Sequence, residues 1–265
     1  MPKSQMNHNN KDYPWLVRSA GSTYPDEPSH GVKLPVTHLI AWILSQYTSV
    51  EEVRQSLPNV VVYAGQVAEV AKSTLHFVVH DKVDTLIIEF VNGTMQLHLN
   101  ESDVLTNYPV LGKQLDNLSR FKDLTNINKD EVNGSGMLGL PGDTTPPSRF
   151  VTAAKLKEFV ADIPKRESEI FSPPEEQVRV LQTLHLLNNL DVVYGTVQEH
   201  DWNGRREFGD YTQWSVVRDH TDCMYYFRTA LNMNLRCVDV KRIARLSDEE
   251  SLFKWDRDWS QKVAL

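Results

Sequence analysis

Cysteine is scarce in this chain of 265 residues, which contains Cys223 and Cys237 and no other cysteine. Lys and Arg are also in deficit, because the net charge is −7 at pH 7. Phosphate binding needs clustered positive charge, so we exclude nucleic acid as a partner. The sequence has no apolar run near the roughly 18 residues of a membrane span, and we expect no membrane partner.

The histidines of the sequence do not have the spacing of a metal-binding site. His76 and His80 are four positions apart on a predicted strand, so about 13 Å would separate them and they cannot share an ion. The remaining histidines are scattered, and no His-Glu-x-x-His pattern occurs. We therefore expect no metal and no cofactor.

The N-terminus, residues 1–10, is polar and lacks the apolar stretch of a signal peptide. As written, the chain is expected to be cytoplasmic, and a periplasmic or secreted location stays open if a preceding segment carries a signal. Residues 1–34 contain prolines and no periodicity, so we expect an irregular tail or lead-in there. Residues 35–265 then form the folded domain.

Hydrophobic periodicity predicts both helices and strands. A helical stripe covers residues 36–47, and a capping box of Thr48 with Glu51, or of Ser49 with Glu52, starts a second short helix. Further helices are expected at residues 112–121 and 150–163. Another is expected to start behind an N-cap at Ser172 and to run to about Asn189.

The predicted strands fall into two blocks. The first block covers residues 60–63, 75–80, 85–91 and 95–99, with a hairpin at Asn92-Gly93 and a further short strand that ends at Asn107. The second block covers residues 191–199, 211–218, 223–229 and 235–240. Tight hairpins mean antiparallel pairing, so the sequence predicts an α+β fold with two antiparallel sheets flanked by helices.

The two cysteines flank the last predicted hairpin. With an even-numbered loop, Cys237 faces Tyr226 and Cys223 faces Val240, so the sulfurs are out of register. We therefore expect buried free thiols rather than a disulfide.

Three segments resemble the choloylglycine hydrolase family, which includes bile salt hydrolases and penicillin V acylases. They are Val104-Leu105-Thr106-Asn107-Tyr108-Pro109, then residues 139–143 running to Ser148-Arg149-Phe150, then residues 211–214 running to Tyr225-Tyr226-Phe227-Arg228-Thr229. The resemblance implies an αββα sandwich of the N-terminal-nucleophile hydrolases, whose members cleave linear amides with an N-terminal cysteine. It covers the rear three-quarters of the family pattern, and we expect the N-terminal part to be missing.

Asn107 and Arg149 are the candidate catalytic residues. By position alone Asn107 is a turn-capping residue, whereas the resemblance implies that its side chain donates to the oxyanion of the tetrahedral intermediate. Arg149 lies near a helix start, where the helix dipole does not favour a cation. The resemblance implies a place beside the nucleophilic thiol, where a cation lowers the thiol pKa. Arg228 is expected to be a structural strand residue.

The front of the family pattern has no match. The chain has no N-terminal Cys, and Arg18 has no Asp three positions on. Cys223 stands next to a polar turn beside His220, and we do not expect it to be the nucleophile.

These observations leave two hypotheses for function. The first is a hydrolase of linear amides, such as conjugated bile acids, phenoxyacetyl penicillins or N-acyl homoserine lactones, which lacks its nucleophile in this chain. The second is a non-catalytic remnant that acts as a scaffold or binding protein. Both predict that the 265-residue chain is inactive, and a homo-oligomer is compatible with either.

Overall fold

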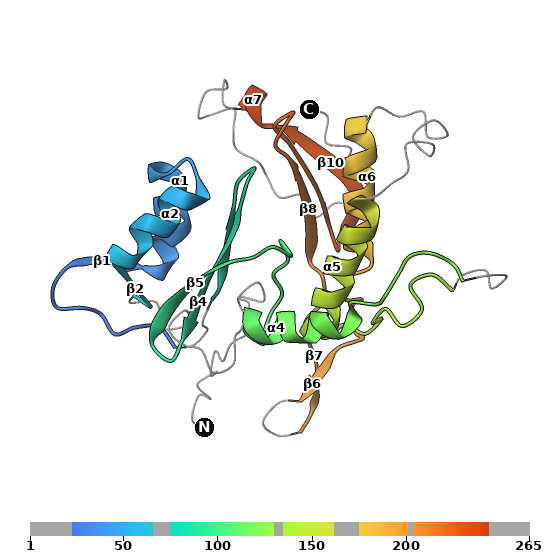
Figure 1. The fold of residues 1–265 in the computed structure, drawn as a ribbon, viewed down its shortest axis with the longest axis horizontal. Helices are drawn as coiled ribbons and strands as arrows, with labels where there is room; N and C mark the ends of the chain where they lie inside the picture. Colours follow the sequence, from blue (N-terminus) through green and yellow to red (C-terminus); the bar gives the residue numbers. More distant parts are fainter. Residues whose placement is uncertain (1–22, 66–74, 130–134, 162–174, 201–203, 244–265) are drawn as a thin grey trace, which may run out of the picture. The chain divides into compact units, whose positions relative to one another are not determined.

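The computed structural model describes residues 23–65, 75–129, 135–161, 175–200 and 204–243 (Figure 1). The chain divides into two compact units, residues 1–155 and 156–265. None of the described helices is long and apolar enough to cross a membrane. The division expected from the sequence, a lead-in over 1–34 and one domain over 35–265, stays a prediction.

The first unit begins with a parallel strand pair and two helices. Strand β1 (Val32–Pro35) pairs with β2 (Val60–Tyr63). Between them lie η1 (Val36–His38), α1 (Leu39–Gln46), α2 (Val50–Ser56) and η2 (Leu57–Asn59). The predicted helices are confirmed, but β1 falls partly within residues that the sequence suggested were irregular. The reason is that β1 is stabilised by its partner strand rather than by a local pattern.

The capping box of α2 uses the second of the two predicted pairs. Ser49 Oγ accepts a hydrogen bond from Glu52 N at 3.3 Å, and the Glu52 carboxylate accepts one from Thr48 N at 2.8 Å. Asp81, from the turn before β4, adds a long-range cap by accepting from Val50 N at 2.7 Å.

An antiparallel sheet follows in the order β3-β4-β5. Its strands are β3 (Phe77–His80), β4 (Thr85–Val91) and β5 (Thr94–Leu99). Asn92 and Gly93 form the predicted tight hairpin, both with positive φ, 50° and 74°. One face of β4 packs on α1 and α2 in a hydrophobic core. The core residues are Val36, Leu39, Ile43, Val50, Val53, Leu57, Val60, Val62, Leu86, Ile88 and Phe90.

The expected strand ending at Asn107 is wrong. Residues 104–107 are neither strand nor helix. Val104 is buried, but its carbonyl accepts from the Asn100 side chain at 2.9 Å, so a local loop contact replaces strand pairing. A cis peptide joins Tyr108 to Pro109. Three helical segments follow: α4 (Leu111–Leu118), η3 (Ser119–Phe121) and α5 (Pro146–Ala161).

The second unit contains α6 (Glu175–Asn188), a small pair β6 (Gln198–His200) and β7 (Arg206–Phe208), and a larger sheet. The strands of that antiparallel sheet lie in the order β10-β9-β8, and α7 follows β10 in the chain. Its elements are β8 (Trp214–Asp219), β9 (Met224–Thr229), β10 (Asn232–Asp239) and α7 (Val240–Ile243). The predicted N-cap Ser172 lies outside the described residues.

One strand of the second block is shorter than predicted. Residues 191–197 do not form a strand, and Val193 and Tyr194 are exposed. Val192 N donates to the Thr212 hydroxyl at 2.8 Å, and Val192 O accepts from Thr212 N at 2.9 Å, so the partner of Val192 is a single residue and not a strand. The apolar run 192–194 misled the prediction because burial, and not composition, decides whether such a run pairs.

The last hairpin has the predicted register only in the part away from its turn. At the turn Asn232 pairs with Thr229, and a register shift between Asn232 and Arg236 then gives the predicted pairing. Cys237 lies opposite Tyr226, and Val240 N donates to Cys223 O at 3.0 Å. Both thiols are free, as expected, but they are half-buried and not buried. Cys223 ends the turn between β8 and β9, with φ 58°.

Candidate active site

Asn107 and Arg149 meet although 42 positions separate them. Arg149 Nη2 donates to Asn107 Oδ1 at 3.0 Å, and both residues are half-buried. The expectation that these two residues come together is therefore confirmed. Their catalytic roles stay a prediction.

This hydrogen bond fixes which way the Asn107 amide points. A guanidinium has donors and no acceptor, so the amide atom that faces it has to be the oxygen. The Asn107 amide nitrogen is thereby turned away from Arg149. Within the described part of the chain, Nδ2 has no hydrogen-bond partner, and it is available as a donor.

Arg149 is held at the start of α5 by contacts with the preceding loop. Its Nε donates to Thr144 O at 3.1 Å, and its backbone N donates to Thr145 O at 2.9 Å. Asp143 organises that loop by accepting from Ser148 Oγ at 2.6 Å and from Thr145 N at 2.9 Å. These hydrogen bonds hold the pKa of Asp143 below its usual range.

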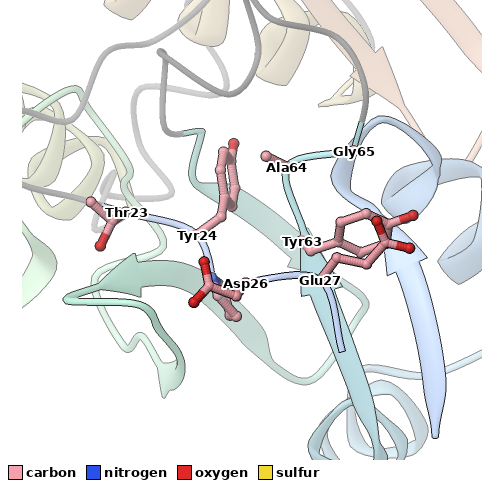
Figure 2. Close-up of a pocket in the computed structure, with 8 residues that line it drawn as sticks. Thr23, Tyr24, Asp26, Glu27, Tyr63, Ala64 and Gly65 are labelled. Carbon is pink, nitrogen blue, oxygen red and sulfur yellow. The ribbon is translucent and has the colours of Figure 1, made fainter. Parts of the chain in front are cut away.

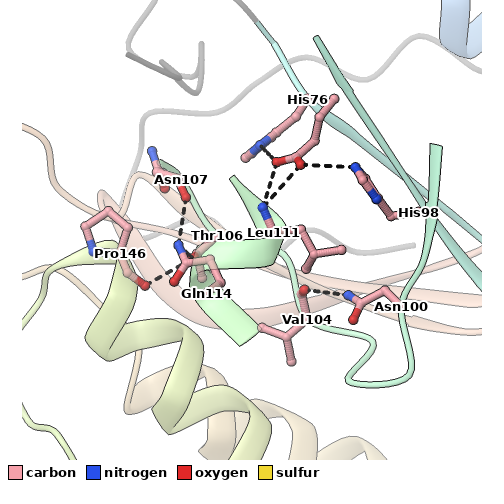
Figure 3. A network of polar contacts seen from close by, with 10 residues as sticks. His76, His98, Asn100, Val104, Thr106, Asn107, Leu111, Gln114 and Pro146 are labelled. Atoms are coloured by element: carbon pink, nitrogen blue, oxygen red, sulfur yellow. Dashed lines mark hydrogen bonds and ion pairs between the residues drawn. The ribbon is translucent and has the colours of Figure 1, made fainter. Parts of the chain in front are cut away.

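The backbone of Asn107 is held by a side chain from α4 (Figure 3). Gln114, one turn into α4, donates from Nε2 to Asn107 O at 3.1 Å and to Thr106 Oγ1 at 3.2 Å. Thr106 Oγ1 donates in turn to Pro146 O at 3.1 Å. The segment 106–107 is therefore tied to the starts of both α4 and α5.

A buried carboxylate lies behind this segment. Glu89, in the middle of β4, is 3% exposed and accepts from Leu111 N, at 3.1 Å to Oε1 and 3.2 Å to Oε2. His76 Nδ1 lies 3.8 Å from Oε1, and His98 Nε2 lies 3.7 Å from Oε2. Dashed lines mark both contacts in Figure 3. The carboxylate thus meets polar groups from the residue before β3, from β5 and from the start of α4.

Sequence reasoning missed Glu89 and Gln114. A signal for Glu89 was available, because it interrupts the apolar run of β4, and a buried carboxylate needs partners. Gln114 gave no such signal, since a Gln on a short amphipathic helix is ordinarily exposed.

The second unit contains Arg228, Cys223 and Cys237, which the sequence also singled out. Arg228 pairs with Asp191 at 2.7 Å, an ion pair within the second unit that fits the structural role expected for it. Among the described residues, no group of His, Cys, Asp and Glu could hold a metal ion.

A separate open cavity of about 290 Å³ lies beside the N-terminal segment (Figure 2). Tyr24, Asp26, Glu27 and Tyr63 line it, and neither Asn107 nor Arg149 does. The Tyr24 hydroxyl accepts from Leu75 N at 2.8 Å, and burial raises the pKa of Tyr24 to about 12.

The sequence model of the linear amide C–N hydrolases, choloylglycine hydrolase family, matches residues 16–251. The chain belongs to this family. A bile salt hydrolase/transferase of Clostridium perfringens is 25% identical over 90% of the chain, and one of Lactiplantibacillus plantarum is 31% identical over 79%. A penicillin V acylase of Pectobacterium atrosepticum is 27% identical over 86% of the chain.

The fold agrees with this membership. A crystal structure of a variant of conjugated bile acid hydrolase from Clostridium perfringens matches 94% of the chain with a TM-score of 0.73 and 22% identity. The predicted α+β fold of the N-terminal-nucleophile hydrolase type is therefore confirmed. The chain spans 72% of the C. perfringens relative, 64% of the L. plantarum relative and 58% of the penicillin V acylase.

Proposed function

We propose that the chain supplies the oxyanion-binding part of a linear amide hydrolase site. Asn107 is the hydrogen-bond donor and Arg149 is the residue that orients it. The observation that supports this function is the 3.0 Å hydrogen bond from Arg149 to Asn107 Oδ1, which leaves Nδ2 as the free donor. Membership of the choloylglycine hydrolase family supplies the reaction class.

The chemistry follows from amide hydrolysis through a thiol. A thiolate attacks the amide carbonyl carbon, and the carbonyl oxygen becomes an oxyanion. The C–N bond then breaks, the amine leaves with the proton that the thiol gave up, and water hydrolyses the remaining thioester to release the acid and restore the thiol. Asn107 Nδ2 would donate to that oxyanion, and one such donor is typically worth about 3 kcal/mol of barrier. The Arg149 guanidinium would lower the pKa of a neighbouring thiol.

The substrate class is a linear amide of a hydrophobic acid. Support comes from the relatives, which include bile salt hydrolases and a penicillin V acylase. Conjugated bile acids and penicillin V are therefore the ligands to test. Cys223 and Cys237 are the cysteines of this sequence, and neither is N-terminal. We accordingly expect the 265-residue chain to bind such amides without hydrolysing them.

The test combines turnover and binding on the 265-residue chain. Glycocholate, taurocholate and penicillin V are incubated with the protein, and release of the free amine is measured. We expect no release above the rate in buffer. The same ligands are titrated into protein labelled with ¹⁵N in its Asn side chains, and the Asn107 signal is assigned by its loss in Asn107→Asp. At least one ligand is expected to shift it.

A matched control is Asn188→Asp on the exposed face of α6, which should change neither binding nor the Asn107 signal. Turnover that disappears in Cys223→Ser or Cys237→Ser would overturn the site assignment. If none of the three ligands shifts the Asn107 signal, the non-catalytic alternative is favoured, in which the chain is a scaffold or binding protein.

The DNA upstream of the Met1 codon gives a second, independent test. In-frame codons for a Cys followed by Arg-x-x-Asp would support the hydrolase. A stop codon or unrelated sequence would support the non-catalytic alternative.

A further inference from the structure

We propose that Glu89 and Gln114 are positioning residues that hold Asn107 in place for amide binding. The inference rests on the function proposed for Asn107 and names the residues behind it. Neither side chain contacts the Asn107 amide group in the described hydrogen bonds. They act through the start of α4 and through the Asn107 backbone.

Glu89 fixes the start of α4. The first N–H groups of a helix have no partner within the helix, and the N-cap residue Val110 provides no side-chain hydrogen bond. Glu89 takes over this task from β4, because its carboxylate accepts from Leu111 N with both oxygens. A carboxylate at this end also complements the helix dipole. The start of α4 is thereby anchored to the middle of the β3-β4-β5 sheet.

Gln114 connects the anchored start of α4 to Asn107. It lies three positions after Leu111, so the two residues are on the same side of the helix. Its Nε2 donates to Asn107 O at 3.1 Å and to Thr106 Oγ1 at 3.2 Å. Asn107 is therefore held by its backbone from α4 and by its side chain from Arg149 on α5.

The burial of Gln114 shows what its side chain contributes. It is 2% exposed, and its Oε1 has no hydrogen-bond partner among the described residues. The amide cannot be turned round to relieve this, since Oε1 would then face the Asn107 carbonyl oxygen. An unpartnered buried acceptor disfavours folding. A methionine would fill the same space without that defect, so the contribution of Gln114 lies in its two N–H donors.

The experiment compares Gln114→Met, Glu89→Leu and Glu89→Gln in the full chain. The readouts are the urea midpoint, the Asn107 side-chain amide signal, and the dissociation constant for glycocholate, taurocholate and penicillin V. Gln114→Met is expected to leave the midpoint unchanged or raise it, to move the Asn107 signal, and to weaken binding about tenfold. A merely structural role would lower the midpoint and leave the Asn107 signal where it is.

Glu89→Leu is expected to move the same Asn107 signal and to speed exchange of the Leu111 amide proton. Glu89→Gln keeps an acceptor and should restore both toward wild type. The control is Glu101→Leu in the exposed turn after β5, which should change nothing.

An unchanged Asn107 signal in Gln114→Met overturns the proposal. If Glu89→Leu does not fold, the result for Gln114→Met is used by itself. If the variants move the signal but no ligand binds the wild type, the positioning role stands and the proposed function falls.

Discussion

The hydrogen bond between Arg149 and Asn107 can be tested by a double-mutant cycle. Asn107→Ala removes the side-chain acceptor of this bond and keeps the backbone oxygen that Gln114 contacts. Arg149→Met removes the bonds to Asn107 Oδ1 and Thr144 O, at 3.0 and 3.1 Å, and keeps most of the aliphatic chain. The double variant therefore loses the shared bond once rather than twice.

The magnitudes follow from the charged donor and the partial exposure. A hydrogen bond to a charged group contributes about 1.5–3 kcal/mol, and we take a value below that range because both residues are half-buried and water competes for the bond. We expect a loss in the free energy of unfolding of about 1 kcal/mol for Asn107→Ala and about 2 kcal/mol for Arg149→Met. The double variant should lose about 2 kcal/mol, which gives a coupling of about 1 kcal/mol.

The assay is urea unfolding followed by circular dichroism, with all four proteins measured at one pH and ionic strength. Arg120→Met is the matched control, because Arg120 is an exposed residue of η3. The changes in the free energy of unfolding caused by Arg120→Met and by Asn107→Ala should add up in the double variant. A double variant that loses the full sum of about 3 kcal/mol would mean that the two side chains do not interact in solution. The orientation of the Asn107 amide, and with it the proposed oxyanion role, would then lose its support.

Three further outcomes are expected. The pKa of Asp81 is lowered, chiefly by the Val50 N–H, so the stabilisation by its carboxylate should be present at neutral pH and lost as pH falls below about 4. Asp81→Asn should therefore have a lower urea midpoint than wild type at pH 7, and the gap should narrow as the pH falls below about 4. Phe150→Ala removes a fully buried ring at the start of α5 and should cost about 3–5 kcal/mol by urea unfolding. Both Cys223 and Cys237 should react with a thiol reagent in the native chain without prior reduction, and mass spectrometry showing a disulfide between them would contradict the observed register.

Local patterns were enough to predict most elements of this fold. The helical stripe of α1, the capping box of α2 and the Asn92-Gly93 hairpin all depend on residues within a few positions of one another. The Cys237–Tyr226 pairing was predicted, but it depends on a register shift between Asn232 and Arg236 that the sequence did not indicate. The predictions failed at residues 104–107 and 191–197, where apolar residues suggested strands. At Val104 the Asn100 side chain, four positions away, took the place of a partner strand. At Val192 the partner is Thr212, 20 positions away, which no local window reveals.

The sequence by itself determined the family, the two candidate residues and the fact that they should meet. Short motifs carry that information, because residue type and order near Asn107 and Arg149 are read directly from the chain. The tertiary structure alone decided how the Asn107 amide is turned and what holds it. Glu89 reaches Leu111 across 22 positions, and Arg149 reaches Asn107 across 42. Contacts of that separation depend on how the whole unit closes, so no propensity or spacing in the sequence could fix their geometry.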